Sequence, residues 1–381
     1  MTDYLIQLRP LTPYFFGSEN TFGEDSTNYF VRSNYLPQQT TLLGFLRYEL
    51  LLQNGLLGTD PGVNGSAWNR LIGQESFRAD QADKLTDFGA IRKISPLFLS
   101  NGTDHYITAP MTMVMYDKDG KEELAGLELS FEETGQSFTT CFRKKVPCLT
   151  VKKETYKAKW EAKPVWLSND GKTIRQWPYE DKFEDGRGFV NGLFIEELQT
   201  GIFRKKAKKK TDKEEGDFYK KVSYRLADNF RFSFIVSFDL PPETKFGTRI
   251  VTMGGERSVF EMTAAPTNKS FENIFPPSLF AGYAGMQKAL VLTSDAFATE
   301  DISTLCDYSI SEGVPFRNIH TKTVPKGDYT RINGGAIAKA GSLTLLLKRG
   351  SVFYGEGLDR VKAALDKPAF SSIGYNQFAE I

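Results

Sequence analysis

Residues 231–240, RFSFIVSFDL, constrain the fold more than any other segment because their hydrophobicity alternates with the two-residue period of a β-strand. Apolar residues share one face of this expected strand: Phe232, Phe234, Val236, Phe238 and Leu240. Polar residues share the other face: Arg231, Ser233, Ser237 and Asp239. Ile235 interrupts the polar series, so we expect neighbouring elements to half cover that second face.

The rest of the chain predicts further strands and one clear helix. Residues 4–10, YLIQLRP, are typical of a strand, and residues 11–26 are typical of a loop that carries an aromatic cluster. In residues 36–55, leucines recur at helical spacing and form a stripe that we assign to the core: Leu42, Leu43, Leu46 and Leu50. Thr40 or Thr41 can cap this helix, and Asn54-Gly55 can end it. Short strands separated by turns are expected in residues 101–200, as in YITAPMTMVMYD and PVWLSNDGKTIRQWPY.

Composition limits the classes of function. The chain has 381 residues, of which 40% are hydrophobic and 13% aromatic, enough for one large or two smaller packed domains. Lys and Arg number 48 and Asp and Glu number 47, so the formal net charge is only +1. A polyanion site must therefore be a local patch and cannot depend on the field of the whole molecule.

Few residues are available for metal binding or for general acid-base catalysis. The three cysteines form no C-x-x-C pair, and the two histidines are His105 and His320. For each histidine we expect a surface or hydrogen-bonded structural role, and we expect no metal site and no cofactor. Phosphate-loop, zinc-protease, nucleophile-elbow and dinucleotide motifs do not occur. The first residues do not resemble a signal peptide and no long apolar run follows, which predicts a soluble cytoplasmic protein with free thiols.

Residues 250–262, IVTMGGERSVFEM, interrupt a strand-like run with Gly254-Gly255-Glu256-Arg257. Glycine permits backbone conformations that side chains disfavour, and it allows another backbone or a ligand to approach closely. The segment is therefore either a hairpin corner or β-bulge, or a loop that contacts a ligand. Arg257 would correspondingly pair with an acid and support the fold, or contact a bound anion.

Residues 201–226, GIFRKKAKKKTDKEEGDFYKKVSYRL, contain a basic run between two expected strands. Six of the seven residues from Arg204 to Lys210 are cationic, and such a run is solvated as a loop or hairpin tip. Aromatic and cationic residues then alternate through Tyr219, Lys220, Lys221, Tyr224 and Arg225. This mixture suits single-stranded nucleic acid, because bases stack on aromatic rings and phosphates pair with cations. The alternatives are a hairpin tip that contacts no partner and a basic arm that docks on an acidic protein.

A second glycine-rich segment occurs near the C-terminus. Gly334-Gly335 and Ala340-Gly341-Ser342 precede the apolar run LTLLLK. Small residues leading into a strand can expose backbone N–H groups to a phosphate, and they are equally typical of a tight joint between a helix and a strand.

Several segments in this order resemble the repeat-associated mysterious protein superfamily of CRISPR systems. They are LRPLTPYFF, LPQQTTLLGFLRYELL, the basic segment just described, VTMGGERSVF, ALVLTSDAF, AKAGSLTLLL and SSIGYNQF, and they span Leu5 to Phe378. Within the superfamily, the chain is most similar to the subunits of type III-B (Cmr) effectors that hold the repeat-derived 5′ tag of the guide RNA.

The resemblance implies an α+β fold of two ferredoxin-like, RNA-recognition-type halves with inserted β-hairpins. The first half would use the Tyr4 strand and the Leu42 helix, and the second the Phe232 strand and the AKAGSLTLLL strand. The corresponding division is residues 1–200 for the N-terminal half, 201–225 for the basic hairpin or loop, and 226–381 for the C-terminal half.

The resemblance also implies a noncatalytic, guide-RNA-binding subunit of a ribonucleoprotein that acts in antiviral defence. Its partners would be the 5′ tag of the guide RNA, the large polymerase/cyclase-like subunit and the backbone subunits, with target RNA contacted indirectly and no membrane involved. The expected RNA-binding residues are Arg47, Arg204, Lys205, Lys206, Lys208, Lys209, Lys210, Tyr219, Lys220, Lys221, Gly254, Gly255, Arg257, Lys339, Gly341 and Ser342.

Two other functions remain open at this point. One is the equivalent subunit of a type III-A (Csm) complex, which shares the architecture. The other is a metal-independent endoribonuclease of the same superfamily that trims precursor repeats, with His320 as its acid-base residue. We also expect loop aromatics such as Tyr14-Phe15-Phe16 and Phe275 to anchor permanent interfaces, which would make the isolated chain poorly soluble.

Overall fold

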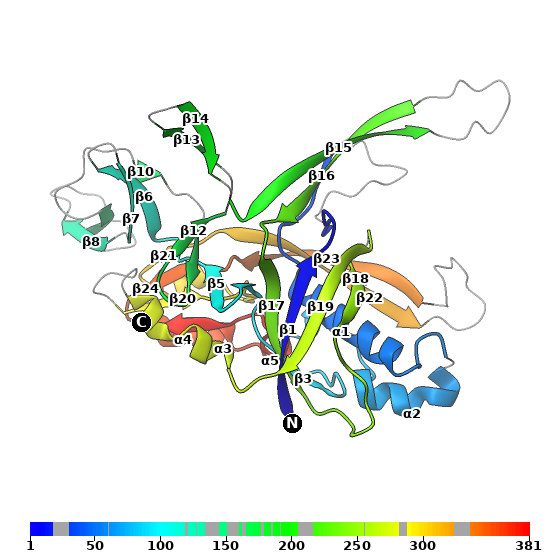
Figure 1. Cartoon of the computed structure of the whole chain (residues 1–381). Helices are drawn as coiled ribbons and strands as arrows, with labels where there is room; N and C mark the ends of the chain where they lie inside the picture. Colours follow the sequence, from blue (N-terminus) through cyan, green and yellow to red (C-terminus); the bar gives the residue numbers. More distant parts are fainter. Residues whose placement is uncertain are drawn as a thin grey trace.

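The computed structural model describes residues 1–17, 30–59, 61–118, 121–126, 128–133, 145–150, 160–161, 165–176, 179–183, 186–190, 192–204, 216–254, 256–281, 288–323 and 336–381. The helices are α1 (Gln39–Gln53), α2 (Pro61–Ile72), α3 (Phe271–Ile274), α4 (Leu358–Leu365) and α5 (Pro368–Ser372), with 3-10 turns η1 (Ala79–Gln81), η2 (Pro277–Leu279) and η4 (Ile302–Thr304). Strands dominate the described residues, and most of their pairings are antiparallel (Figure 1).

A large central sheet organises the molecule, and its strand order is β12-β11-β5-β4-β17-β1-β19-β18, with β3 also paired to β17. Its strands are β1 (Thr2–Pro10), β3 (Ile91–Ile94), β4 (Phe98–Asn101), β5 (Asp104–Thr108), β11 (Val165–Ser168), β12 (Thr173–Arg175), β17 (Phe230–Phe238), β18 (Arg249–Met253) and β19 (Ser258–Pro266). The predicted strands near Tyr4 and Phe232 are β1 and β17, and they pair directly from Thr2–Phe238 to Leu8–Phe232.

Both faces of β17 are buried, which follows from its sequence. Phe232, Phe234 and Val236 lie in the same hydrophobic cluster as Ile6 and Leu8 of β1. Ile235, on the opposite face, is 6% exposed and packs in a second cluster with Phe98 and Ile107. The predicted covering of that second face is confirmed, and it is more complete than expected.

Helix α1 covers the first face of the sheet with its leucine stripe. Leu42, Leu43, Leu46 and Leu50 are all buried, as predicted. The helix ends at Asn54 and Gly55, where Gly55 has a φ of +68°. The predicted threonine cap is wrong: Gln38 is the N-cap residue and makes no side-chain capping bond, because the helix already begins at Gln39.

The second face is covered by a smaller sheet with the order β21-β24-β20-β25. Its strands are β20 (Ala289–Leu292), β21 (Tyr308–Ile310), β24 (Val352–Tyr354) and β25 (Phe378–Glu380). Strand β20 divides its side chains between two cores: Ala289 and Val291 join Ile235, whereas Leu290 and Leu292 pack with Val361 of α4. The layers are therefore helix, central sheet, small sheet and helix.

Strand pairs outside these layers complete the described structure. Two of these units have three strands: β15 (Phe194–Arg204) and β16 (Gly216–Leu226) with β2 (Phe30–Arg32), and β6 (Met113–Lys118) between β7 (Lys121–Gly126) and β10 (Trp160–Glu161). The others are two-stranded: β22 (Gly313–Thr323) with β23 (Ala336–Leu347), β13 (Tyr179–Phe183) with β14 (Gly186–Val190), and β8 (Glu128–Glu133) with β9 (Lys145–Thr150). Figure 1 shows β15–β16 and β22–β23 as long hairpins.

The α+β prediction is confirmed at the level of mixed structure with mostly antiparallel sheets and few helices. The two ferredoxin-like halves and their residue boundaries stay predictions. Strands β1 and β17, which the resemblance assigns to different halves, pair with each other within one sheet, and β23 of the expected second half pairs with β22 among the described residues.

Among the described helices, none is both long and apolar enough to cross a membrane.

The predicted role of the loop aromatics as interface anchors is wrong for three of them. Tyr14 and Phe16 are 0% and 4% exposed, and their rings pack against Phe232 and Phe260 of the central sheet. Phe275 is 2% exposed and belongs to the second core. These three rings stabilise the chain's own fold, and the expectation of a poorly soluble isolated chain stays a prediction.

Candidate nucleic-acid interface

The basic segment forms the predicted hairpin, and a third strand extends it into a sheet. Strands β15 and β16 pair in register from Phe194–Leu226 to Arg204–Gly216. Strand β2 adds to β16 in parallel, with Lys220 opposite Phe30 and Val222 opposite Arg32. We call this three-stranded unit the hairpin sheet. Lys205, Lys206, Lys208, Lys209 and Lys210 lie outside the described residues, between the two strands.

The predicted site residues on β16 differ in their surroundings. Lys220 is exposed, whereas the Lys221 side chain is 16% exposed. Tyr224 is buried and its ring packs against Tyr14, so this tyrosine is not available to stack on a base. Arg204 ends β15 and Tyr219 lies within β16, in register with Gly201.

The β18–β19 hairpin reverses between Gly254 and Arg257, which confirms the hairpin prediction for this segment. The backbone N–H of Arg257 donates to the Gly254 carbonyl at 3.1 Å, and Met253 pairs with Ser258. Gly254 has a φ of +83°, and a Cβ atom there would lie 3.0 Å from the Phe15 carbonyl oxygen. Glycine therefore meets a conformational and a steric requirement at once. Gly255 lies outside the described residues.

This turn and the hairpin sheet meet through Lys221. Its Nζ donates to the Glu256 carboxylate at 2.9 Å and lies 4.7 Å from the centre of the Phe15 ring. The Phe15 backbone N–H in turn donates to the Ser258 hydroxyl at 3.1 Å. Three segments far apart in sequence thus join at one surface, and the charge of Lys221 is neutralised there within the fold.

Arg257 remains exposed at this surface, with a φ of +52°. Its side chain makes no hydrogen bond or ion pair with the part of the chain that the structure describes, and Glu256 pairs with Lys221 instead. The positive φ is unusual for a residue other than glycine and costs free energy. Arg257 is therefore free to contact a bound anion.

Arg47 lies on α1 and is half-buried. Its Nε atom is buried and has no hydrogen-bond partner among the described residues, and burial lowers the pKa of its guanidinium group. No described ion pair connects it to the hairpin sheet or the turn, so the structure does not bring Arg47 together with the other predicted residues.

Part of the second glycine-rich segment lies within a strand, whereas Gly334 and Gly335 lie outside the described residues. Lys339, Gly341 and Ser342 belong to β23 of the β22–β23 hairpin. The register shifts there: Ile319 pairs with Ala340 and Arg317 with Leu343, so Gly341 and Ser342 lie opposite Asn318 alone. Gly341 and Ser342 therefore form a β-bulge, in which one extra residue bends the strand, and not an approach into a strand or a helix–strand joint.

Sequence reasoning missed the residues that flank the hairpin. Phe30 is 45% exposed on β2, and the Arg32 guanidinium carbon lies 5.7 Å from the centre of its ring. Arg32 Nη1 also donates to the Tyr224 hydroxyl at 3.2 Å and to the Glu196 carboxylate. A three-residue strand gives too short a pattern to be recognised, so only the pairing with β16 reveals its position.

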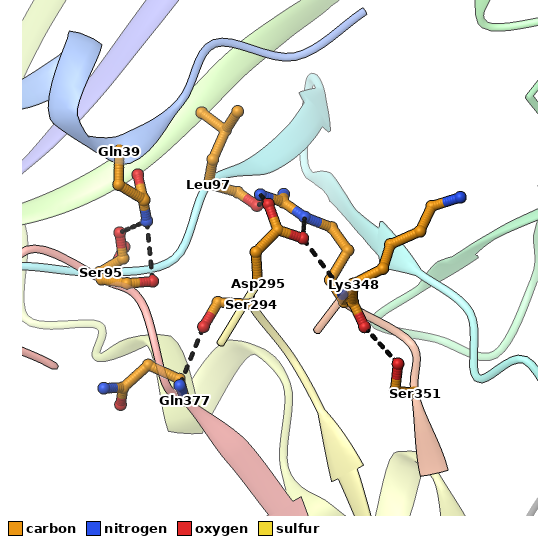
Figure 2. Close-up of polar contacts among 10 residues, drawn as sticks. Gln39, Ser95, Leu97, Ser294, Asp295, Lys348, Ser351 and Gln377 are labelled. Carbon is orange, nitrogen blue, oxygen red and sulfur yellow. Dashed lines mark hydrogen bonds and ion pairs between the residues drawn. The ribbon is translucent and has the colours of Figure 1, made fainter. Parts of the chain in front are cut away.

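A buried polar junction connects three other segments that carry the resemblance, ALVLTSDAF, SSIGYNQF and LPQQTT. The Arg349 side chain is 5% exposed and donates from Nε and Nη2 to the two Asp295 carboxylate oxygens at 3.1 and 3.0 Å. Gln39 Nε2 donates to the carbonyls of Ser95 and Gly374 at 3.0 and 2.9 Å. Figure 2 shows these contacts, in which side chains and backbone groups from distant parts of the chain point toward one another. We call the Arg349–Asp295 pair and these neighbours the junction.

A cavity of about 80 Å³ borders the junction and is lined by residues 34–38, Asp295, Val314, Pro315, Leu346, Lys348, Arg349 and Tyr375. The cations beside it are already paired, since Lys348 Nζ lies 2.7 Å from Glu312 and Arg349 is bound to Asp295. The junction therefore has the character of a structural link between segments.

The two histidines have different surroundings. His105 is buried, and its Nδ1 lies 2.8 Å from the Ser100 hydroxyl, which confirms a hydrogen-bonded structural role. Burial lowers the pKa of its imidazole, with the charge of Lys269 acting in the same direction. His320 lies in β22, opposite Lys339. Among the described residues, no three His, Cys, Asp or Glu side chains gather as a metal site would require.

Comparison with protein families identifies the chain. The sequence model described as CRISPR-associated protein (Cas_Cmr3) matches residues 6–380. The chain belongs to the Cas_Cmr3 family. This match confirms the predicted relation to Cmr-type proteins of the repeat-associated superfamily, and it covers the central sheet, both hairpins and the junction.

Solved structures give weaker likenesses. A chain of the cryo-EM structure of the Type III-B Cmr-beta bound to cognate target RNA has 14% identity and a TM-score of 0.45, with 99% of this chain and 96% of that chain covered. A chain of the Csm3-Csm4 subcomplex in the type III-A CRISPR-Cas interference complex has 9% identity and a TM-score of 0.33, with 93% and 92% covered. Among curated proteins, none matches significantly. The family assignment rests on the sequence match.

Proposed function

We propose that this protein is a noncatalytic RNA-binding subunit of a type III-B effector, working in the cytoplasm, that holds the repeat-derived 5′ tag of the guide RNA. Its membership of a CRISPR-associated family supports this role. The observation that carries the proposal is the meeting of the glycine turn, the Phe15 loop and the hairpin sheet at one surface. Exposed Arg257 at this surface is suited to phosphate oxygens, and so is exposed Lys220 of β16, whose side chain lies on the opposite face of the hairpin sheet from Lys221.

The same proposal includes the two ferredoxin-like halves and the partner subunits. The first half would be built on β1 and α1 and the second on β17 and β23, with the large polymerase/cyclase-like subunit and the backbone subunits as partners. Support comes from the central pairing of β1 with β17 and from the packing of α1 on that sheet. Two halves whose backbones do not superpose on each other in a structure of the assembled complex would refute the two-half arrangement.

Purification with bound RNA tests the role directly. The protein is purified from its source with its partners, and the bound RNA is sequenced. One repeat-derived 5′ end shared by all guides is expected, and the partners that copurify distinguish a type III-B from a type III-A complex. Metal-free incubation with labelled repeat RNA tests the noncatalytic role, since specific cleavage that His320→Ala abolishes would establish the endoribonuclease instead.

The basic run predicts a measurable salt dependence. If Lys205, Lys206, Lys208 and Lys209 contact phosphates, changing all four to Ala should flatten the slope of log affinity against log salt by about 3, at about 0.7 per contact on single strands. The loss should be similar for RNA of any sequence, because phosphate contacts carry no sequence information.

A matched control removes the same charge elsewhere, through Ala at the exposed residues Lys84, Lys93, Lys172 and Lys269. The control should leave the slope nearly unchanged. An unchanged slope in the hairpin variant with normal assembly would show that the run does not contact the RNA, and an unchanged slope with lost assembly would assign it to a protein partner.

A further inference from the structure

One face of the hairpin sheet aligns an aromatic ring with a cation. Phe30 of β2 lies opposite Lys220 of β16, and Lys220 lies opposite Thr200 of β15. Paired residues on neighbouring strands share a face of the sheet, with strands about 4.8 Å apart. The phenyl ring and the ammonium group therefore stand side by side, at a separation that one nucleotide can span.

The next row on this face is partly apolar and partly charged. Arg32 lies opposite Val222, which is 3% exposed and belongs to the main core, and Val222 lies opposite Leu198, which is 60% exposed. Arg32 is held by Glu196 and by the Tyr224 hydroxyl, and its guanidinium carbon lies 5.7 Å from the Phe30 ring centre. Arg32 thus orients the ring while its charge is largely balanced by Glu196.

Lys220 provides the unbalanced charge on this face. It is exposed, and it forms no ion pair with the described residues, in contrast to Lys221, which pairs with Glu256. An exposed phenyl ring beside an unpaired cation complements a base joined to a phosphate, because the base stacks and the phosphate pairs. An acidic protein would match Lys220 but would leave the exposed ring and Leu198 without a specific role.

We propose that Phe30 is a base-stacking platform for single-stranded RNA and that Lys220 contacts the phosphate of the stacked nucleotide. The inference deepens the proposed function and rests on it, since it assigns base contact to this face. Tyr224, one of the two aromatic residues in the sequence pattern of β16, cannot serve in this way because it is 2% exposed, whereas Phe30 is 45% exposed.

The test uses the full chain with fluorescein-labelled octauridine, octaadenosine and an RNA duplex of sixteen base pairs. Phe30→Ala should weaken binding of both single strands about tenfold, within the range of alanine substitutions at stacked bases. Duplex binding should change less than twofold, because paired bases are not free to stack on the protein. Phe30→Trp should keep the affinity, and its indole fluorescence should be quenched by both single strands.

Lys220→Ala should flatten the single-strand salt slope by about 0.7, the value for one phosphate contact. Leu85→Ala is the control, since Leu85 is 66% exposed outside the hairpin sheet, and it should leave every affinity unchanged. Melting temperatures of all variants should match the wild type, because each altered side chain is exposed.

Wild-type protein that binds single strands with an affinity that Phe30→Ala does not alter would overturn this inference and leave the proposed function standing. Equal weakening of duplex and single strands would also overturn it. Unaltered RNA binding with lost capture of the large subunit would assign the face to a protein partner instead. Wild-type protein that binds no RNA would overturn both the inference and the proposed function.

Discussion

The junction and the hairpin sheet both use cations, yet burial gives these cations opposite roles. The Arg349 side chain in the junction is 5% exposed, and its Nε and Nη2 atoms both donate hydrogen bonds to the Asp295 carboxylate. Lys220 in the hairpin sheet is exposed and unpaired within the described chain. A buried charge must be paired, because desolvation is costly, whereas a solvated charge keeps its capacity to bind a ligand. The junction therefore stabilises the fold and the hairpin sheet is available for recognition.

Removing the buried cation should have the largest effect. Arg349→Leu leaves the Asp295 carboxylate in the junction without its partner, and we expect a loss of about 3–5 kcal/mol in the free energy of unfolding. Urea unfolding measures this loss. The double variant Arg349→Leu with Asp295→Leu should recover much of it, since no unpaired buried charge remains.

The comparison would fail if Arg349→Leu cost less than about 1 kcal/mol, the upper range of an exposed pair. Arg70→Ala provides that exposed reference, because Arg70 and Glu243 are 61% and 70% exposed. The comparison between the junction and the hairpin sheet would also fail if Arg349→Leu weakened RNA binding by the folded protein, since the junction would then contribute to recognition.

A smaller effect is expected where the glycine turn meets the Phe15 loop. Gly254→Ala must adopt a φ of +83° and place its Cβ 3.0 Å from the Phe15 carbonyl oxygen. We expect a loss of about 1–3 kcal/mol in the free energy of unfolding. Gly55→Ala is a matched control, because Gly55 has a φ of +68° and no atom within 4 Å of the added Cβ.

The Gly55→Ala control should lose only the free energy that a positive φ costs a residue with a side chain, about 1–2 kcal/mol. The difference between the two variants in thermal or urea unfolding then measures the close approach of the Phe15 loop. Equal losses would mean that the loop moves aside at no cost, and the turn would not hold the recognition surface in place.

The smallest expected effect concerns a buried titratable group. Burial lowers the pKa of His105 below its ordinary value of 6.5. The unfolded chain therefore binds a proton at a higher pH than the folded chain, so stability is present above about pH 6.5 and is lost as the pH falls through the folded pKa. His105→Gln should reduce the decline in unfolding free energy below pH 6.5.

Urea unfolding at several pH values between 7 and 5 measures this slope. A decline of the same steepness in His105→Gln would show that other groups cause the acid sensitivity.

Local sequence determined the elements of this protein because periodicity and turn chemistry are properties of neighbouring residues. The alternation of residues 231–240 specified β17, the leucine spacing specified α1, and the glycines before Glu256 indicated a turn or bulge that the structure shows to be a hairpin corner. The ordered series of segments was also sufficient to indicate the family, which the match to residues 6–380 confirms.

Tertiary structure decided which of these residues are accessible. Tyr14 and Phe16 were expected in an exposed loop, but the central sheet buries them. Phe30 gave no sequence signal and is exposed because β2 lies at the edge of the hairpin sheet. Lys220 and Lys221 are adjacent in sequence, yet Glu256 neutralises only Lys221. Successive strand residues face opposite sides, and what covers each side comes from distant parts of the chain, so burial and pairing could not be derived from the local pattern.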